Sequence, residues 1–380
     1  MKKLHRHFGR RVGFVNANLS YFASSCLALS QSCLPVLSTL AAGCILQAAP
    51  LRGAEFVYVA ALLDNTIVAY KINSNGALTY VPGSPFATGT EPYAVAVDSV
   101  AKRVYVANNG DNTISGYTIA LNGALTPVPG SPFATGNQPV SVAVDPGAKR
   151  VYVANNSDNT ISGYKIASNG ALTPVPDSPF AAGIEPNWLA VDSSNKCVYV
   201  TDYGANVVSG FSILSNGELS PLSASPFAAG TEPLSIAVDA AAKCVYVTNV
   251  VSHDISGYKI NLQGNLTPVP GSPFPAGAGD FLSSVAVDPK GKFVYVTNGK
   301  NNGVYGYKID PDGAIKYVGA FNTGNDPIAA VVDPSDKFVY MANTIDATIS
   351  AYKIDLNGAL KPVKGSPFAT GNEPNSIAIF

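Results

Sequence analysis

The sequence predicts an all-β protein, a single seven-bladed β-propeller built from four-stranded blades. Three observations support this prediction. A Val-Tyr-Val tripeptide or a close variant recurs along the chain, short runs rich in Val, Ile, Tyr and Thr alternate with turn residues, and no long segment has a helical period. The tripeptides are spaced by 47, 47, 47, 47, 49 and 45 residues, and they centre on Tyr58, Tyr105, Tyr152, Tyr199, Tyr246, Tyr295 and Tyr340.

One repeat contains four short runs that each fit a β-strand. In the third copy they lie at 138–145, 150–155, 160–166 and 170–175, separated by Asp-Pro, Asp-Asn and Asn-Gly turn signals. Four strands in about 47 residues are the length of one propeller blade. Seven copies account for residues 55–380, which we therefore take as one propeller domain.

The two ends of the repeated region complement each other. The region begins at 55–59 with the second strand of a blade, and it ends at 374–380 with the first strand of a blade. We expect the C-terminal strand to pair into the first blade and to close the ring. An open ring would leave an unpaired strand edge at each end.

Residues 1–54 are typical of an export leader. Five basic residues and no acidic residue lie in 1–44, and an apolar stretch with small residues follows them. Ala42-Gly43-Cys44 resembles a lipobox, which would make Cys44 a lipid anchor, and cleavage near Ala48 is the alternative. The apolar stretch is too short for a membrane span, so we expect none in the mature chain. The predicted location is periplasmic, extracellular or on the cell surface.

Composition excludes several classes of protein. Charged residues make up only 13% of the chain, which argues against a charge-rich disordered chain and against a coiled coil. The chain has 24 basic and 25 acidic residues, and because five basic residues belong to the leader, the propeller is acidic and without basic clusters. Such a surface binds nucleic acid poorly. We expect a monomer whose partner is a protein or a carbohydrate.

Several repeated polar residues fit a structural role. An aspartate ends the first strand in six copies, where its side chain can accept hydrogen bonds from turn N–H groups. These aspartates are Asp98, Asp145, Asp192, Asp239, Asp288 and Asp333. Outside the leader the cysteines are Cys197 and Cys244, which occupy equivalent places in neighbouring copies. Equivalent places in two blades are too far apart for a disulfide, so we predict free, packed thiols.

The candidate binding residues are acidic. A carboxylate precedes the first strand in most copies, and the sevenfold geometry would place these side chains around one mouth of the central channel. Two interpretations remain open: solvated turn residues, or a carboxylate rim suited to a divalent cation or to sugar hydroxyls. The sequence predicts no catalytic residue, no metal ligand set and no cofactor. The carboxylates are Glu91, Glu185, Glu232, Asp326 and Glu373, with Asp280 nearby in the longest copy.

Two further residues depart from the repeat near the predicted mouth. Trp188 stands where the other copies have Ala or Ser, and it either plugs the channel mouth or offers a stacking platform. His253 lies in the loop between the second and third strands, where it is either a surface residue or a site residue.

The motifs resemble those of a known family. Val245-Tyr-Val-Thr-Asn249 and Val294-Tyr-Val-Thr-Asn298 match the YVTN-type propeller repeat, and the Asn-Gly-Ala-Leu and Ser-Pro-Phe elements are similar to the seven-bladed lactonase-like family, which includes bacterial 6-phosphogluconolactonases. The resemblance implies an active site of His, Arg and Glu at the channel mouth. This propeller contains one histidine, His253, and two arginines, Arg103 and Arg150, in repeat-equivalent places that we expect on the opposite face.

Two functional hypotheses follow. The first is an exported, non-enzymatic propeller that binds or scaffolds a partner, because the first three copies are nearly identical and leave little room for an asymmetric site. The alternative is a lactonase-like hydrolase of a sugar lactone. Since the fifth and sixth copies break the spacing, we predict that any ligand, a cation or a polyol, binds weakly near Glu232, Asp280, Asp326 and Trp188.

Overall fold

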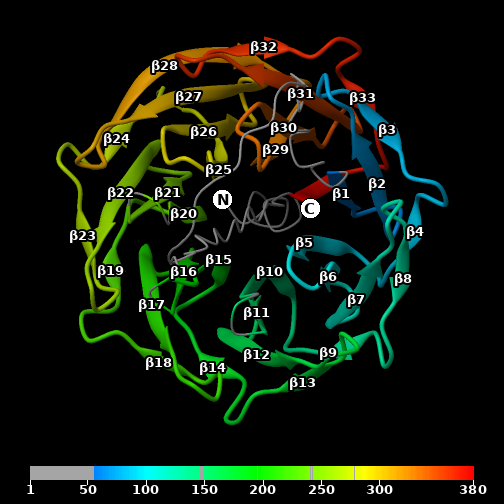
Figure 1. Ribbon diagram of the computed structural model, residues 1–380. Helices are drawn as coiled ribbons and strands as arrows, with labels where there is room; N and C mark the ends of the chain where they lie inside the picture. Colours follow the sequence, from blue (N-terminus) through cyan, green and yellow to red (C-terminus); the bar gives the residue numbers. More distant parts are fainter. Residues whose placement is uncertain are drawn as a thin grey trace, which may run out of the picture.

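The computed structural model describes residues 55–380 except 146, 148, 195, 240, 242 and 278. These residues form seven antiparallel sheets arranged as blades around a central axis (Figure 1). The predicted leader and Cys44 lie outside the described residues. In the described part of the chain, no helix is long and apolar enough to cross a membrane.

Each blade begins with its innermost strand at the axis and continues outward (Figure 1). Blade 1 contains β34 (Pro374–Ile379), β1 (Phe56–Ala61), β2 (Thr66–Ile72), β3 (Leu78–Tyr80) and β4 (Phe86–Ala87). Blade 2 contains β5 (Pro92–Asp98), β6 (Arg103–Asn108), β7 (Thr113–Ile119), β8 (Leu125–Pro127) and β9 (Phe133–Ala134). Blade 3 contains β10 (Pro139–Asp145), β11 (Arg150–Asn155), β12 (Thr160–Ile166), β13 (Leu172–Pro174) and β14 (Phe180–Ala181).

The remaining blades follow the same order. Blade 4 contains β15 (Pro186–Asp192), β16 (Cys197–Asp202), β17 (Val207–Ile213), β18 (Leu219–Pro221) and β19 (Phe227–Ala228). Blade 5 contains β20 (Pro233–Asp239), β21 (Cys244–Asn249), β22 (Asp254–Ile260), β23 (Leu266–Pro268) and β24 (Phe274–Pro275). Blade 6 contains β25 (Leu282–Val287), β26 (Phe293–Asn298), β27 (Gly303–Ile309) and β28 (Ile315–Asn322). Blade 7 contains β29 (Pro327–Val332), β30 (Phe338–Asn343), β31 (Thr348–Ile354), β32 (Leu360–Pro362) and β33 (Phe368–Ala369).

The structure confirms the predicted blade number and ring closure. Strand β34 pairs antiparallel with β1, with Val57 opposite Ile379 and Val59 opposite Ile377. The C-terminal strand thus supplies the innermost strand of blade 1.

The outer edge of the blades differs from the predicted single fourth strand. In six blades this edge is split into a three-residue strand and a two-residue strand, which both pair with the third strand. A cis Ser-Pro bond lies between the two pieces in each of them, for example Ser178–Pro179. Proline has no N–H to donate to a ladder, so the pairing stops there. Blade 6 has no such break, and its outer strand β28 is continuous.

The repeated tyrosine joins each blade to the next one. These seven side chains are fully buried, and each hydroxyl donates a hydrogen bond to a glycine carbonyl in the following blade, at 2.6–3.0 Å. The last of these bonds, from Tyr340 to Gly76, crosses the ring closure. Gly76 has a φ of 85°, and a Cβ there would lie 2.4 Å from the Phe338 ring. The tyrosine and the glycine therefore recur because each blade must pack closely against the next one.

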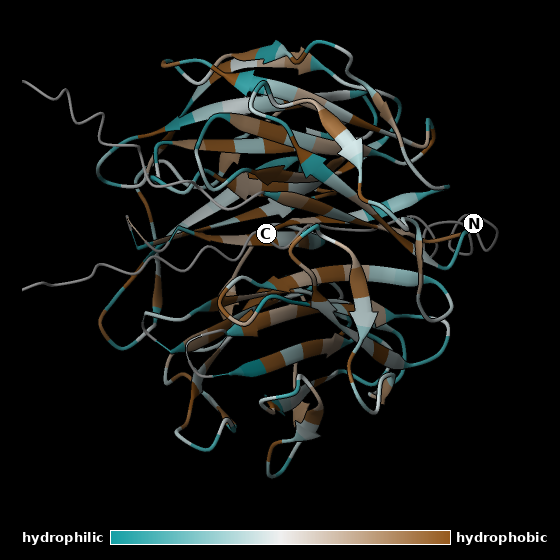
Figure 2. Ribbon diagram, turned by 45° about the vertical axis from the view of Figure 1, so that its right-hand side comes forward, coloured by the Kyte–Doolittle hydropathy of each residue, from teal (hydrophilic) through white to brown (hydrophobic). Residues whose placement is uncertain are grey.

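The two ends of the disc have different loops. We call the end where the innermost strands begin, at positions such as Glu91 and Pro92, the mouth end. The opposite end, with the turns between the first and second strands and between the third and outer strands, is the turn end. Hydrophobic and hydrophilic residues alternate along many strands, and the connecting loops carry both kinds (Figure 2).

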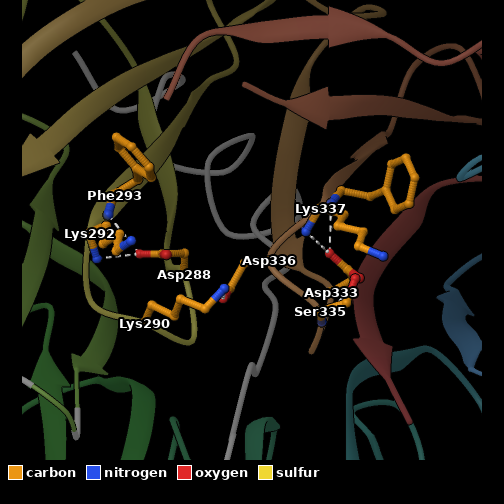
Figure 3. Close-up of polar contacts among 9 residues, drawn as sticks. Asp288, Lys290, Lys292, Phe293, Asp333, Ser335, Asp336 and Lys337 are labelled. Carbon is orange, nitrogen blue, oxygen red and sulfur yellow. Dashed lines mark hydrogen bonds and ion pairs between the residues drawn. The ribbon is translucent and has the colours of Figure 1, made fainter. Parts of the chain in front are cut away.

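The aspartates that end the innermost strands cap turns, as predicted. Asp288 Oδ1 accepts hydrogen bonds from the backbone N–H groups of Lys292 and Phe293, both at 2.6 Å, and Asp333 makes the matching bonds in blade 7 (Figure 3). A salt bridge of 2.6 Å between Lys290 and Asp336 joins these two turns across the blade junction. All six repeated aspartates are buried, and within the described residues five of them accept hydrogen bonds from turn backbone, while Asp145 accepts one from Ser193 Oγ of blade 4.

Cys197 and Cys244 are free and buried, as predicted. Each sulfur packs against a glycine of the next blade, where a Cβ at Gly264 would lie 2.4 Å from Cys197 Sγ. Burial raises the pKa of both thiols. The cysteines take the packing position that Phe or Arg fills in other blades.

Candidate functional site

The acidic residues of the predicted rim occupy one position in five blades. They are Glu91, Glu185, Glu232, Asp326 and Glu373, each directly before an innermost strand and each with a positive φ of 47–57°. Glu91 and Glu185 are exposed, and the other three are half-buried. They therefore lie at equivalent places around the mouth end, and whether they bind a ligand stays a prediction.

An asparagine side chain holds the backbone of this linker position at five blade junctions in the described part of the chain, four of them with a carboxylate residue and one with Gln138. Asn65 Oδ1, in the loop after the second strand of blade 1, accepts a hydrogen bond of 2.8 Å from the backbone N–H of Glu91 in the next blade. The same contact joins Asn159 to Glu185 and Asn206 to Glu232 at 2.8 Å, and Asn302 to Asp326 at 3.0 Å. This hydrogen bond, which we call a clip, holds the linker backbone and does not involve the carboxylate side chain.

His253 takes the place of this asparagine in blade 5. It has the same left-handed backbone, with a φ of 55°, and its Nδ1 lies 2.6 Å from the carbonyl oxygen of Asp280. A carbonyl oxygen only accepts, so Nδ1 carries the proton in this contact. His253 is thus a clip between blades 5 and 6.

Asp280 lies beneath the surface and away from an open rim. It is 3% exposed, Tyr305 donates to its Oδ2 at 2.9 Å, and Asn301 Nδ2 donates to its Oδ1 at 2.5 Å. Tyr305 replaces the serine that other blades carry at this position, and its longer side chain reaches the inserted linker. Asp280 therefore anchors the longer linker, which accounts for the departure from the 47-residue spacing.

Trp188 is fully buried in the hydrophobic core. The residue equivalent to Trp188 in blade 3 is Ser141. Its Oγ accepts a hydrogen bond from Leu189 N of blade 4, so the side chain at this repeat position faces the next blade. Thr201 Oγ1 accepts from Trp188 N and donates to Leu234 O of blade 5, both at 2.9 Å. This burial favours packing between blades 4 and 5 over a stacking platform.

A cluster at the mouth end brings two of the predicted glutamates, Glu185 and Glu232, together with Tyr203, which the sequence prediction missed. The Tyr203 hydroxyl donates a hydrogen bond to Glu232 Oε2 across the junction of blades 4 and 5. Glu185 Oε2 is 3.3 Å from the place of a Cβ on Gly204, next to Tyr203. Burial, the hydrogen bond to Glu232 and the charges of both glutamates raise the pKa of Tyr203, so its phenol stays protonated.

The missed residue had a signal in the sequence. Tyr203 follows the second strand, where the neighbouring copies have Asn109 and Asn156. Two residues after Glu185, at the start of β15, lies Asn187, whose Oδ1 is buried and has no hydrogen-bond partner among the described residues. Glu185, Asn187, Tyr203 and Glu232, which we call the blade 4–5 cluster, are the candidate site.

Asp202 is a second missed departure, just before Tyr203. Five other blades end this strand with asparagine, such as Asn155, and blade 1 ends it with Ala61, but Asp202 is a fully buried carboxylate. Ser209 Oγ donates to it at 2.5 Å, and Gly183 N donates to it at 3.1 Å. Burial raises the pKa of Asp202 to about 6, although these hydrogen bonds oppose the shift.

The two arginines lie at the turn end. Arg103 donates to the carbonyl oxygens of Ala167 and Ser168 in blade 3, and Arg150 donates to Ser215 O in blade 4 at 3.3 Å. Both open a second strand, so they clip neighbouring blades at the end opposite the mouth. The arginine that the family resemblance implies at the mouth is therefore not supplied by either residue.

No metal-binding group forms in the described part of the chain. No three His, Cys, Asp or Glu side chains there approach closely enough to hold an ion. The predicted cation at Glu232, Asp280 and Asp326 gains no support from this arrangement, whereas a polyol needs only hydrogen-bonding groups.

Solved structures of several proteins are similar to this seven-bladed fold. A candidate 6-phosphogluconolactonase from Bacteroides uniformis is 19% identical, with a TM-score of 0.76 over 87% of this chain and 100% of that one. A periplasmic gluconolactonase from Pseudomonas aeruginosa is 16% identical, with a TM-score of 0.74 over 86% and 99%. A Lactobacillus plantarum protein is 20% identical, with a TM-score of 0.74 over 86% and 99%.

These likenesses show the fold, and the sequence match to a family is more specific. No curated protein matches the chain. Residues 57–378 match the family described as "Lactonase, 7-bladed beta-propeller", which covers nearly the whole described ring. The chain is therefore a member of the seven-bladed lactonase family.

Proposed function

We propose that this propeller hydrolyses an unphosphorylated sugar lactone at the blade 4–5 cluster. The observation that carries the proposal is the Tyr203–Glu232 hydrogen bond at the channel mouth, with Glu185 close to it. Family membership and a gluconolactonase among the structural neighbours support the reaction class. They favour hydrolysis over the non-enzymatic hypothesis, which we keep as the second candidate.

The cluster contains a carboxylate that could act as the general base of lactone hydrolysis. Glu232 would accept a proton from water while the water oxygen attacks the lactone carbonyl carbon. The ring C–O bond then breaks, and the proton passes to the departing ring oxygen, which leaves an open-chain hydroxy acid. Tyr203 fixes the carboxylate by donating to one oxygen, and Asn187 offers a buried acceptor for a substrate hydroxyl.

The charge of the mouth selects against phosphorylated substrates. Glu185 and Glu232 belong to an acidic ring, whereas Arg103 and Arg150 lie at the other end of the disc. An acidic mouth repels a phosphate and also repels the carboxylate product once it forms. A neutral lactone can enter, and its anionic product is expelled.

The test measures hydrolysis of glucono-δ-lactone and 6-phosphogluconolactone by the purified chain. We expect turnover above the spontaneous rate, with kcat/KM higher for the unphosphorylated lactone. Glu232→Gln should lower kcat roughly a hundredfold or more, because it removes the base. Glu91→Gln is the matched control at the same repeat position and should leave kcat unchanged.

The second candidate is an exported binding propeller without activity. It is favoured by the structural use of His253 and Asp280, which engage each other across blades 5 and 6. Export itself remains a proposal, supported by the basic and apolar start of the chain and by the periplasmic neighbour. Failure to hydrolyse either lactone, with retained binding of a simple neutral sugar, would select this candidate.

A further inference from the structure

The turn end of the disc carries a ring of lysines. Lysine occupies the same turn position, just before the second strand, in six blades. Its carbonyl oxygen accepts a hydrogen bond from the last residue of the third strand, as in Ile119 N to Lys102 O at 2.8 Å, so both turns of a blade meet at this end. Lys243 is half-buried and the other side chains are exposed: Lys102, Lys149, Lys196, Lys292 and Lys337.

Acidic groups at this end offer less exposed charge than the lysines, although Asp312, in the turn between the third and outer strands of blade 6, is exposed. The six repeated aspartates are buried, and among the described residues five of them accept hydrogen bonds from turn backbone, as Asp98 does from Val100 and Ala101. Asp145 accepts one from Ser193 Oγ. Asp310 and Asp355 pair with Lys316 and Lys361 at 2.8 Å. The mouth end has the opposite character, because its linker carboxylates include the exposed Glu91 and Glu185.

Three leucines project from the same end. Leu121 is 90% exposed, Leu262 is 93% exposed and Leu356 is fully exposed. Each sits at the tip of the turn between the third and outer strands, where the turn is closed by other groups: in blade 2, Gly123 N donates to Ala120 O and Ala124 N donates to Asn122 Oδ1.

The turn does not require leucine at its tip. Blades 1, 3 and 4 carry serine there, at Ser74, Ser168 and Ser215. An apolar side chain gains free energy only when it leaves water, so three bare leucines on a lysine-rich face indicate a surface that covers them.

We propose that the turn end docks on a bilayer that contains anionic phospholipids. Leucine tips that enter the interface and lysines that contact head groups are the combination that binds peripheral proteins to such membranes. The leucines belong to blades 2, 5 and 7, so they are distributed around the ring rather than gathered in one patch. A planar surface contacts all three at once, whereas a protein partner usually buries one central cluster.

Sedimentation of the full chain with vesicles tests this proposal. We expect binding to phosphatidylcholine vesicles that contain phosphatidylglycerol, weak binding to phosphatidylcholine alone, and loss of binding at high salt. The triple variant Leu121→Ser, Leu262→Ser, Leu356→Ser should weaken binding roughly tenfold or more. Lys102→Gln with Lys149→Gln and Lys196→Gln should do the same.

Matched controls separate docking from damage to the fold. The leucine variant introduces the residue that three blades already have, so its melting temperature should equal that of the parent. The triple variant Leu63→Ser, Val251→Ser, Ile345→Ser removes exposed apolar side chains from the mouth end and should bind vesicles like the parent.

Several outcomes would overturn the proposal. These are absence of vesicle binding, equal binding to neutral vesicles, or binding that the mouth-end variant abolishes. Capture by soluble polyphosphate that the leucine variant leaves unchanged would identify a polyanion site instead. Concentration-dependent dimers that the leucine variant abolishes, without vesicle binding, would identify a second copy of the chain as the partner.

Discussion

Blades 3 and 4 share one backbone and differ at the mouth. The pairing of Pro139 with Asn155 in blade 3 recurs as Pro186 with Asp202 in blade 4, and the deeper register is the same. Four mouth positions differ between them: Gln138, Ser141, Asn155 and Asn156 of blade 3 correspond to Glu185, Trp188, Asp202 and Tyr203 of blade 4, and at the first of these it is blade 3 that departs from the repeat. The comparison teaches that the repeat fixes strands and turns, while a few positions at strand ends are free to become individual.

Replacing Trp188 by serine, the residue at the equivalent position in blade 3, should have the largest effect on stability of the changes considered. Trp188→Ser empties a fully buried site between blades 4 and 5 and should lower the free energy of unfolding by about 3–5 kcal/mol. Chemical denaturation measures the change. The matched Ser141→Ala in blade 3 should cost about 1 kcal/mol, since it removes one hydrogen bond. Equal costs for the two variants would show that Trp188 is not a packing residue.

Asp202 should make stability depend on pH. Its folded pKa of about 6 lies above the usual value of 3.8, so the folded state binds the proton more tightly. The stability that this proton contributes is complete below about pH 4 and is lost as the pH rises through about 6. Asp202→Asn should therefore stabilise the protein by about 2–3 kcal/mol above pH 7 and by little near pH 4.

The converse change supplies the control for Asp202. Asn155 donates to Thr160 Oγ1 and to Ser162 Oγ at 3.0 and 2.8 Å, and Asn155→Asp would place a carboxylate among the same buried groups. The melting temperature of Asn155→Asp, measured across the pH range, should then fall above about pH 6, where the parent residue causes no such fall. A flat profile for the parent protein, or for this variant, would contradict the assignment.

A tyrosine pair gives the smallest expected effect. Tyr164 of blade 3 donates its hydroxyl to Ala134 O of blade 2 at 2.7 Å, whereas blade 4 has Phe211 at this position. Tyr164→Phe should cost about 1 kcal/mol. Phe211→Tyr should recover a similar amount if blade 4 keeps the geometry of blade 3. Calorimetry of the two variants shows whether the blades are equivalent away from the mouth.

The sequence predicted the ring because its determinants repeat. Tyr58 and its equivalents, the capping aspartates and the pairing of 374–380 into blade 1 all follow from periodic residues with one structural role each. The broken outer strand was not predicted, because a Ser-Pro pair inside a strand-like run does not reveal that two pieces share one partner.

The candidate site was less predictable. Departure from the repeat drew attention to Trp188, His253 and Asp280, but not to what they do, because their partners lie on other strands and loops, 13 to 27 residues away in the chain. Tyr203 was overlooked since one aromatic residue in a variable loop position has no pattern of its own. Only the ring places its hydroxyl against Glu232, 29 residues away in the chain.

The tyrosine bonds between blades also bear on how the molecule unfolds. Every blade donates such a bond to one neighbour and accepts one from the other, and the bond from Tyr340 to Gly76 leaves no terminal blade. A linear repeat array can fray from its ends, but this ring exposes two core faces whenever one blade opens. We therefore expect the amide hydrogens of all seven second strands to exchange at one common, slow rate, with protease resistance lost in a single step rather than blade by blade.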